Sequence, residues 1–121
     1  MSTSELAAPV AAVRAAIDAT DRDWGELPFF VRPMVRRGFR QRTGHDVDGW
    51  RALLAAAARG TPATDLPAAL DALVEHWRGA PERARKGMSG SPAQLAEIER
   101  RLAPRIAAAL ALRALVAPAT S

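Results

Sequence analysis

The sequence predicts an all-helical protein of about five helices that pack as a compact antiparallel bundle or an orthogonal array. Apolar residues recur three and four positions apart along most of the chain, which is the spacing that forms one face of a helix. Glycine and proline interrupt this spacing at intervals suited to short helix connections. Alternating β-branched residues, which would indicate strands, are nearly absent. The 121 residues are typical of a single domain, 1–121.

The first helix is expected over about residues 5–20, with an acidic segment, 18–23, at its end. Pro9 is expected in the first turn, where the missing N–H of proline breaks no helix hydrogen bond. The apolar face of this helix, with spacings of four, three and four, consists of Leu6, Val10, Val13 and Ile17.

The second element lies between Pro28 and Thr43 and is expected to divide at Pro33. A proline inside a helix removes a hydrogen bond, so residues 27–32 are expected to form a separate turn. The regular helix then begins at Pro33 and ends at Gly44, a residue type that favours the left-handed conformation of a helix cap.

The next two helices have clear ends. The third is expected to begin with Asp46 or Asp48 as N-cap and to stop at Gly60. Its apolar residues are Trp50, Leu53, Leu54 and Ala57. The fourth is expected to begin with Thr64 as N-cap and to end at Gly79. Its apolar residues are Leu66, Leu70, Leu73, Val74 and Trp77.

Residues 80–91 are expected to form a flexible loop, because a basic run followed by small residues buries little apolar surface. The last helix opens with Ser91 as N-cap, Pro92 at the first helical position and Gln94 three residues after the cap. This is the pattern of a capping box. Pro104 lies inside the helical spacing that follows and is expected to kink the helix.

Cysteine is absent, which excludes disulfides and thiolate metal sites and fits a reducing compartment such as the cytoplasm. No basic and apolar leader precedes the first helix, so no secretory signal is expected. The longest apolar stretch, 106–117, is interrupted by Arg113 and is shorter than the roughly 20 residues that span a bilayer. We therefore expect a soluble cytoplasmic protein without a transmembrane segment.

The residue types that catalysis and metal binding require are missing or misplaced. His45 and His76 are isolated from each other and are expected as a turn residue and a partly exposed helix residue. The aspartates of 18–23 lack the glycine and distal glutamate of a calcium loop and are expected to form a charged turn. The glycines of 87–90 lack the strand and lysine of a phosphate-binding loop. We expect no catalytic residue, metal or cofactor, and predict that the protein is not an enzyme.

Positive charge is concentrated in one part of the chain. The formal net charge is +4, and all but one of the 17 basic residues are arginine, the exception being Lys86. A bacterial-like, GC-rich genome also produces a joint excess of arginine and alanine, so the distribution of charge is more informative than its total. Residues 27–60 contain seven arginines and only two aspartates.

The expected helix from Pro33 carries this charge on one side. At 100° per residue, Arg36, Arg37 and Arg40 fall opposite an apolar arc. That arc consists of Met34, Val35, Gly38 and Phe39, and Arg42 lies beneath its end. The candidate partner-binding residues are this basic ridge, extended one turn earlier, and the aromatic residues upstream of it: Arg32, Arg36, Arg37, Arg40, Trp24, Phe29 and Phe30.

Several functions are compatible with this ridge. It is the solvated face of a helix, or it docks an acidic protein or a larger complex, since arginine and aromatic residues are enriched at interfaces. In the docking interpretation, which we favour, the protein is a non-enzymatic accessory or small subunit. Nucleic-acid binding through the same helix is the main alternative, weakened by the scarcity of lysine and the acidic first helix. A further alternative is a homo-oligomer through 92–116 with an apolar ligand cleft.

Residues 26–58 resemble the small helical module at the C-terminal end of a subunit of light-independent protochlorophyllide reductase. The residues that carry the resemblance are Pro28, Phe30-Val31-Arg32, Val35-Arg36-Arg37, Gly44 and Val47. Arg37 and Arg40 replace the glutamate and alanine that are usual before the turn, and the sequence has neither the reductase body nor its cluster-binding cysteines. The resemblance implies a module that packs on a larger enzyme, and it implies no reductase activity.

Overall fold

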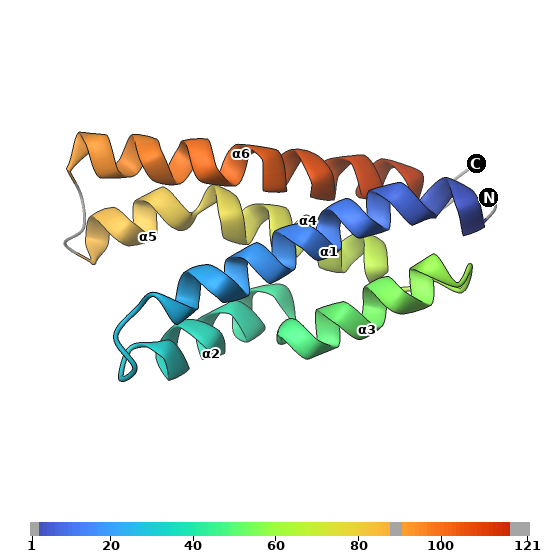
Figure 1. Cartoon of the computed structure of the whole chain (residues 1–121), viewed down its shortest axis with the longest axis horizontal. Helices are drawn as coiled ribbons and strands as arrows, with labels where there is room; N and C mark the ends of the chain where they lie inside the picture. The colour runs from blue at the N-terminus through green and yellow to red at the C-terminus, as the bar shows by residue number, and fades with distance from the viewer. Residues whose placement is uncertain (1–2, 88–90, 117–121) are drawn as a thin grey trace.

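The computed structural model describes residues 3–87 and 91–116, and within these ranges it contains six helices and no strand. The prediction of an all-helical fold is therefore confirmed, whereas the helix count is six and not about five. The helices form four legs that run alternately in opposite directions along the molecule (Figure 1). The legs are α1 (Thr3–Gly25); α2 (Arg32–Thr43) with α3 (Val47–Ala58); α4 (Leu66–Arg78) with α5 (Ala80–Lys86); and α6 (Pro92–Leu115).

Helix α1 is central, because it packs against both α3 and α6. The expected apolar face of α1, from Leu6 to Ile17, is buried. The helix is longer than predicted at both ends: it begins at Thr3, so that Pro9 lies inside it, and it continues to Gly25. The acidic segment 18–23 is therefore helical and not a charged turn, and its aspartates form ion pairs with arginines of α2, α3 and α6.

The helix ends of the second leg agree closely with those predicted from the sequence. Helix α2 begins at Arg32, with Pro33 in its first turn. It ends at Gly44, which has a φ of 85° and donates its N–H to the carbonyl oxygen of Arg40 over 2.8 Å. Asp46 then caps α3 by accepting a hydrogen bond of 2.7 Å from the N–H of Gly49. The connection between α2 and α3 thus takes only three residues.

We predict that Gly44→Ala lowers the free energy of unfolding by about 1–2 kcal/mol, because a side chain raises the energy of the left-handed conformation. A Cβ atom on Gly44 would meet no atom within 4 Å, so the loss would come from the backbone alone. The matched control is Gly25→Ala, which also has open space and no positive φ. Urea unfolding should separate the two variants, and equal stability would contradict the prediction.

The third leg differs from the expectation. Helix α4 is capped by Asp65 and not by Thr64, and the side chain of Asp65 makes no capping hydrogen bond. Most of the segment expected as a loop, 80–91, is helical, because α5 occupies Ala80–Lys86. Pro81 lies in its first turn, and Glu82 pairs with Arg85 one turn later. Residues 88–90 lie outside the described residues.

Helix α6 opens with the predicted capping box between Ser91 and Gln94. The helix continues through Pro104 to Leu115 without interruption (Figure 1). Its apolar second half buries Ala109 and Leu112 against the bundle, while Leu110 is 42% exposed. Within the described ranges, no helix has both the length and the apolar character that crossing a membrane requires.

Candidate functional site

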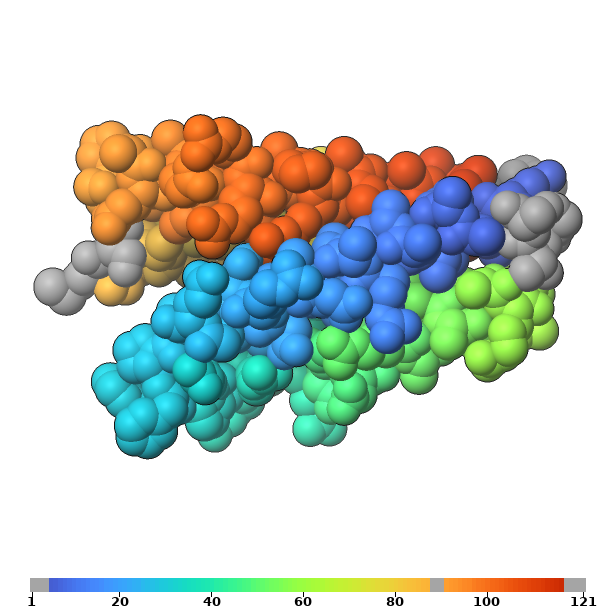
Figure 2. Space-filling model, viewed as in Figure 1, coloured from blue at the N-terminus to red at the C-terminus, as the bar shows by residue number. Residues whose placement is uncertain are grey.

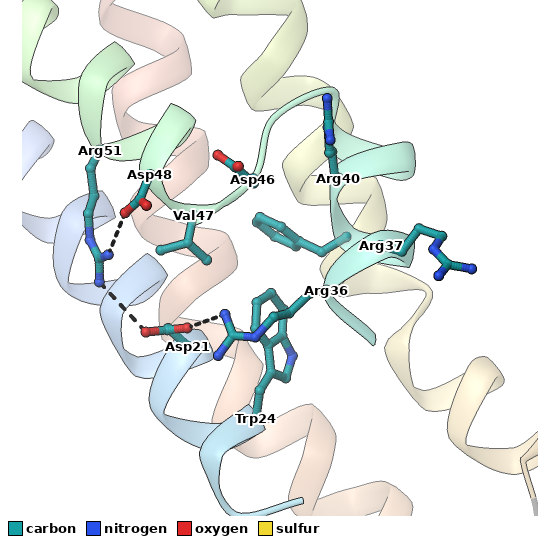
Figure 3. Close-up of a pocket in the computed structure, with 10 residues that line it drawn as sticks. Asp21, Trp24, Arg36, Arg37, Arg40, Asp46, Val47, Asp48 and Arg51 are labelled. Atoms are coloured by element: carbon teal, nitrogen blue, oxygen red, sulfur yellow. Dashed lines mark hydrogen bonds and ion pairs between the residues drawn. The ribbon is translucent and has the colours of Figure 1, made fainter. Parts of the chain in front are cut away.

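Four of the seven residues predicted to bind a partner line one pocket of about 540 Å³ between α1, α2 and the start of α3 (Figure 3). They are Trp24, Arg36, Arg37 and Arg40. The other lining residues are Asp21, Phe39, Asp46, Val47, Asp48 and Arg51. Arg32, Phe29 and Phe30 do not line it. The pocket is therefore built from arginines of α2 that face aspartates of α1 and α3.

Trp24 belongs to the core and is a poor candidate for direct partner contact, since it is only 7% exposed. Its ring packs edge to face on Phe39, with 5.1 Å between the centroids. The guanidinium carbon of Arg36 lies 5.3 Å from the centre of the same ring. The sequence does indicate that Trp24 is buried, because Thr20 and Trp24 continue the spacing of three and four residues that defines the buried face of α1 up to Ile17.

Arg36 is neutralised within the molecule. Its Nη1 donates to Oδ1 of Asp21 over 2.8 Å (Figure 3). Arg51 of α3 adds to this network by pairing with Asp18 at 2.9 Å and with Asp48 at 3.1 Å. The hydrogen bond from Arg51 lowers the pKa of Asp18, and Asp18 in turn raises the pKa of Arg51. These ion pairs join α1, α2 and α3, so the first role of Arg36 and Arg51 is to hold the legs together.

Arg32 is also used internally. Its Nε donates to the carbonyl oxygen of Leu27 over 2.9 Å, and its Nη2 donates to the carbonyl oxygen of Gly25 over 2.6 Å. Gly25 is the last residue of α1, and Leu27 lies in the connection between α1 and α2. The side chain therefore closes this turn and does not extend the basic ridge toward a partner.

Arg37 and Arg40 are exposed like Arg36, but neither of them forms an ion pair with an acid in the described part of the chain. The three acids that line the pocket are already engaged, since Asp21 pairs with Arg36, Asp46 caps α3 and Asp48 pairs with Arg51. The outer side of α2 therefore carries two positive charges that are not balanced locally.

Phe29 and Phe30 are the most exposed aromatic side chains of the described residues, at 78% and 71%. They touch each other edge to face with a centroid distance of 5.8 Å. Met34, which the helical arc assigned to the buried face, is instead 65% exposed. We call these three residues the Phe–Met patch. Of the four large apolar side chains that are exposed in the described ranges, three belong to this patch and the fourth is Leu110.

A second charged cluster, which the sequence did not indicate, surrounds His76. This residue is 8% exposed, and so it is buried and not partly exposed as expected. Its ring packs against Phe39, and its Nδ1 accepts a hydrogen bond of 3.0 Å from Nε of Arg42. His45 occupies the expected turn after Gly44, with its Nε2 3.5 Å from Oδ2 of Asp65.

No family model matches the chain, and no curated protein or solved structure is significantly similar to it. The resemblance of residues 26–58 to a reductase module therefore stays a prediction.

Proposed function

We propose that the protein is a non-enzymatic accessory subunit that docks on an acidic protein surface through the Phe–Met patch, Arg37 and Arg40. One observation carries the proposal: three of the four exposed large apolar side chains in the described ranges lie within residues 29–34. Two arginines without an acidic partner follow them on α2. An apolar anchor beside unpaired arginines is the composition found at the centres of protein interfaces.

The helical register supports a single contact surface. Met34, Arg37 and Gln41 are spaced three and four apart on α2, so they share one face, and all three are exposed. Arg37 also lines both the pocket beside α1 and a groove on the other side of α2, which places it between the two hollows. A partner that seats the Phe–Met patch would therefore bring acidic groups to Arg37 and Arg40.

A protein is a better partner for this surface than nucleic acid. In a helix-turn-helix, α3 would be the recognition helix after the Gly44 turn. Arg51 of α3 forms ion pairs with Asp18 and Asp48, and the remaining outward positions of this helix are mostly alanine. The aspartates of α1 that border the ridge would repel phosphates. The Phe–Met patch would make no favourable contact with the phosphate backbone of a nucleic acid, whereas it would fill an apolar pocket on a protein.

Charge reversal tests the proposal. Arg37→Glu/Arg40→Glu is expected to weaken binding at least tenfold, because two repulsive contacts replace two attractive ones. The matched control is Arg22→Glu/Arg59→Glu, which changes the net charge equally at two other exposed arginines. The partner would be captured from the protein's own cells, purified, and its Kd measured for each variant. Phe29→Ser/Phe30→Ser should weaken binding similarly and leave the folded state intact, since both rings are exposed.

The same variants would be mixed with vesicles of anionic phospholipid and with a short DNA duplex. Exposed phenylalanines beside arginines can also insert into a membrane interface. Binding to vesicles or to the duplex, without a protein whose Kd separates the two double variants, would overturn the proposal. Equal weakening in both double variants would do the same, because it would show attraction by net charge alone.

A further inference from the structure

Two arginines from different legs meet at His76. Nε of Arg42, on α2, donates to Nδ1 of His76 over 3.0 Å. Nη2 of Arg83, on α5, lies 3.4 Å from the same nitrogen and donates to the carbonyl oxygen of His76 over 2.6 Å. Neither arginine forms an ion pair with a carboxylate in the described ranges. Two cations therefore converge on a neutral ring without a counter-charge.

Two glycines give these guanidinium groups their room. A Cβ atom on Gly38 would lie 2.7 Å from Nη2 of Arg42, and one on Gly79 would lie 2.8 Å from Nη1 of Arg83. Gly38 is inside α2, where glycine is less stable than alanine by roughly 0.5–1 kcal/mol. The backbone thus gives up helix stability at a position that leaves space for the head of Arg42.

The charges also oppose each other. Burial, followed by the charge of Arg42, lowers the pKa of Arg83 to about 10, so Arg83 is still cationic at neutral pH. Burial and the two arginines lower the pKa of His76 to about 3, so its ring is neutral. The hydrogen bond from Nη2 of Arg83 to the carbonyl oxygen of His76 caps the end of α4, so this nitrogen of Arg83 has a structural role. The Nη atoms of Arg42 make no hydrogen bond with any described residue.

The cluster lies in the wall of an open groove of about 1000 Å³ that is lined by residues of α1, α2, α4, α5 and α6. Apolar lining residues include Leu27, Val35, Trp77, Ala84, Ile98 and Leu102. Trp77 adds a buried indole N–H that finds no acceptor among the described residues. In Figure 2 the surface is indented between the α1–α2 turn (cyan) and α5 (gold), at the end of the bundle where the groove lies.

Positive charge dominates this groove. Its lining contains five arginines and two carboxylates, those of Asp23 and Glu26. The carboxylate of Asp23 forms ion pairs with the guanidinium groups of Arg105, at 2.9 Å, and Arg101, at 3.7 Å. Arg37, Arg42 and Arg83 therefore keep hydrogen-bonding capacity for a ligand, and of these only Arg42 and Arg83 converge at His76.

We infer that this groove binds a small amphipathic carboxylate, with the carboxylate on Arg42 and Arg83 and the apolar body along α2, α5 and α6. A carboxylate matches the planar fork of a guanidinium and would relieve the repulsion between the two arginines. The volume of the groove is at the upper end of the range for small-molecule sites, which are mainly apolar with a few convergent polar groups. This site does not depend on the docking function proposed above.

Calorimetric titration of the full chain with octanoate, and with octan-1-ol as the neutral ligand of equal length, tests the site. Octanoate should bind, and the alcohol should bind roughly tenfold more weakly or worse, because hydrogen bonds to a charged group are lost. Arg42→Gln should remove this preference. Arg22→Gln, at an exposed arginine that lines neither the groove nor the pocket beside α1, should retain it.

Gly38→Ala separates the site from the stability of the fold. It keeps every charge and favours the helix, but its methyl group displaces the guanidinium of Arg42. We expect octanoate to bind this variant several-fold more weakly, while thermal unfolding occurs at an equal or higher temperature. In NMR spectra of the wild type, octanoate should shift the ring signals of His76 and the indole N–H of Trp77. Absence of binding, equal affinity for acid and alcohol, or unchanged affinity in both Arg42→Gln and Gly38→Ala would each overturn the inference.

Discussion

Trp50→Ala is expected to lower the free energy of unfolding by about 3–5 kcal/mol, which is the usual loss when a large aromatic side chain is removed from a core. The side chain of Trp50 is fully buried. Its Nε1 donates to the hydroxyl of Thr43 over 2.9 Å, and that hydroxyl donates to the carbonyl oxygen of His45 over 3.0 Å. The truncation would open a cavity and also release the polar link between the end of α2 and the start of α3.

Urea unfolding followed by circular dichroism measures this loss. A domain of this size is stable by only about 5–15 kcal/mol, so the variant should unfold at a clearly lower urea concentration. Trp50→Phe, which keeps most of the volume and loses the indole hydrogen bond, should fall between the wild type and the alanine variant. Leu110→Ala is the exposed control and should change stability by less than about 1 kcal/mol. A loss of under 1 kcal/mol for Trp50→Ala would contradict the burial of this side chain in the core.

Local chemistry explains why most helix ends could be predicted. Gly44 adopts the left-handed conformation that only glycine accepts readily, and Asp46 and Ser91 cap helices through their own side chains. These signals involve residues no more than a few positions apart. Helix α5 has local support from Pro81 and from the Glu82–Arg85 pair, but it also packs against α6, a contact that the basic composition of the segment does not indicate.

The candidate site was predictable only in part for the same reason. The helical angle correctly placed Arg37 and Arg40 on the outside of α2, but it says nothing about which acids lie across from an arginine. The partner of Arg36 is Asp21, 15 residues away, and that of Arg51 is Asp18, 33 residues away. The cluster at His76 joins residues 34 positions apart, so neither spacing nor charge runs could indicate it.

Acid is expected to destabilise the protein through His76. Its pKa in the folded state is about 3, mainly because burial disfavours the charged ring and secondarily because Arg83 and Arg42 repel it. The pKa of histidine in an unfolded chain is about 6.5. Below that pH the unfolded state binds the extra proton, so the stability is complete above pH 6.5 and is lost as the pH falls toward 3. The expected loss is about 1.4 kcal/mol per pH unit, or about 2 kcal/mol between pH 6.5 and 5.

The interval between pH 7 and 5 suits this measurement, because it lies above the pKa values of aspartate and glutamate in model peptides. His76→Asn offers an oxygen to Arg42 in place of Nδ1 and cannot take up the proton. We expect it to be less stable at pH 7 but nearly independent of pH in urea unfolding. His45→Asn, which leaves His76 in place, should keep the pH dependence of the wild type. An equal slope in the wild type and in His76→Asn would show that His76 is not held neutral between the two arginines.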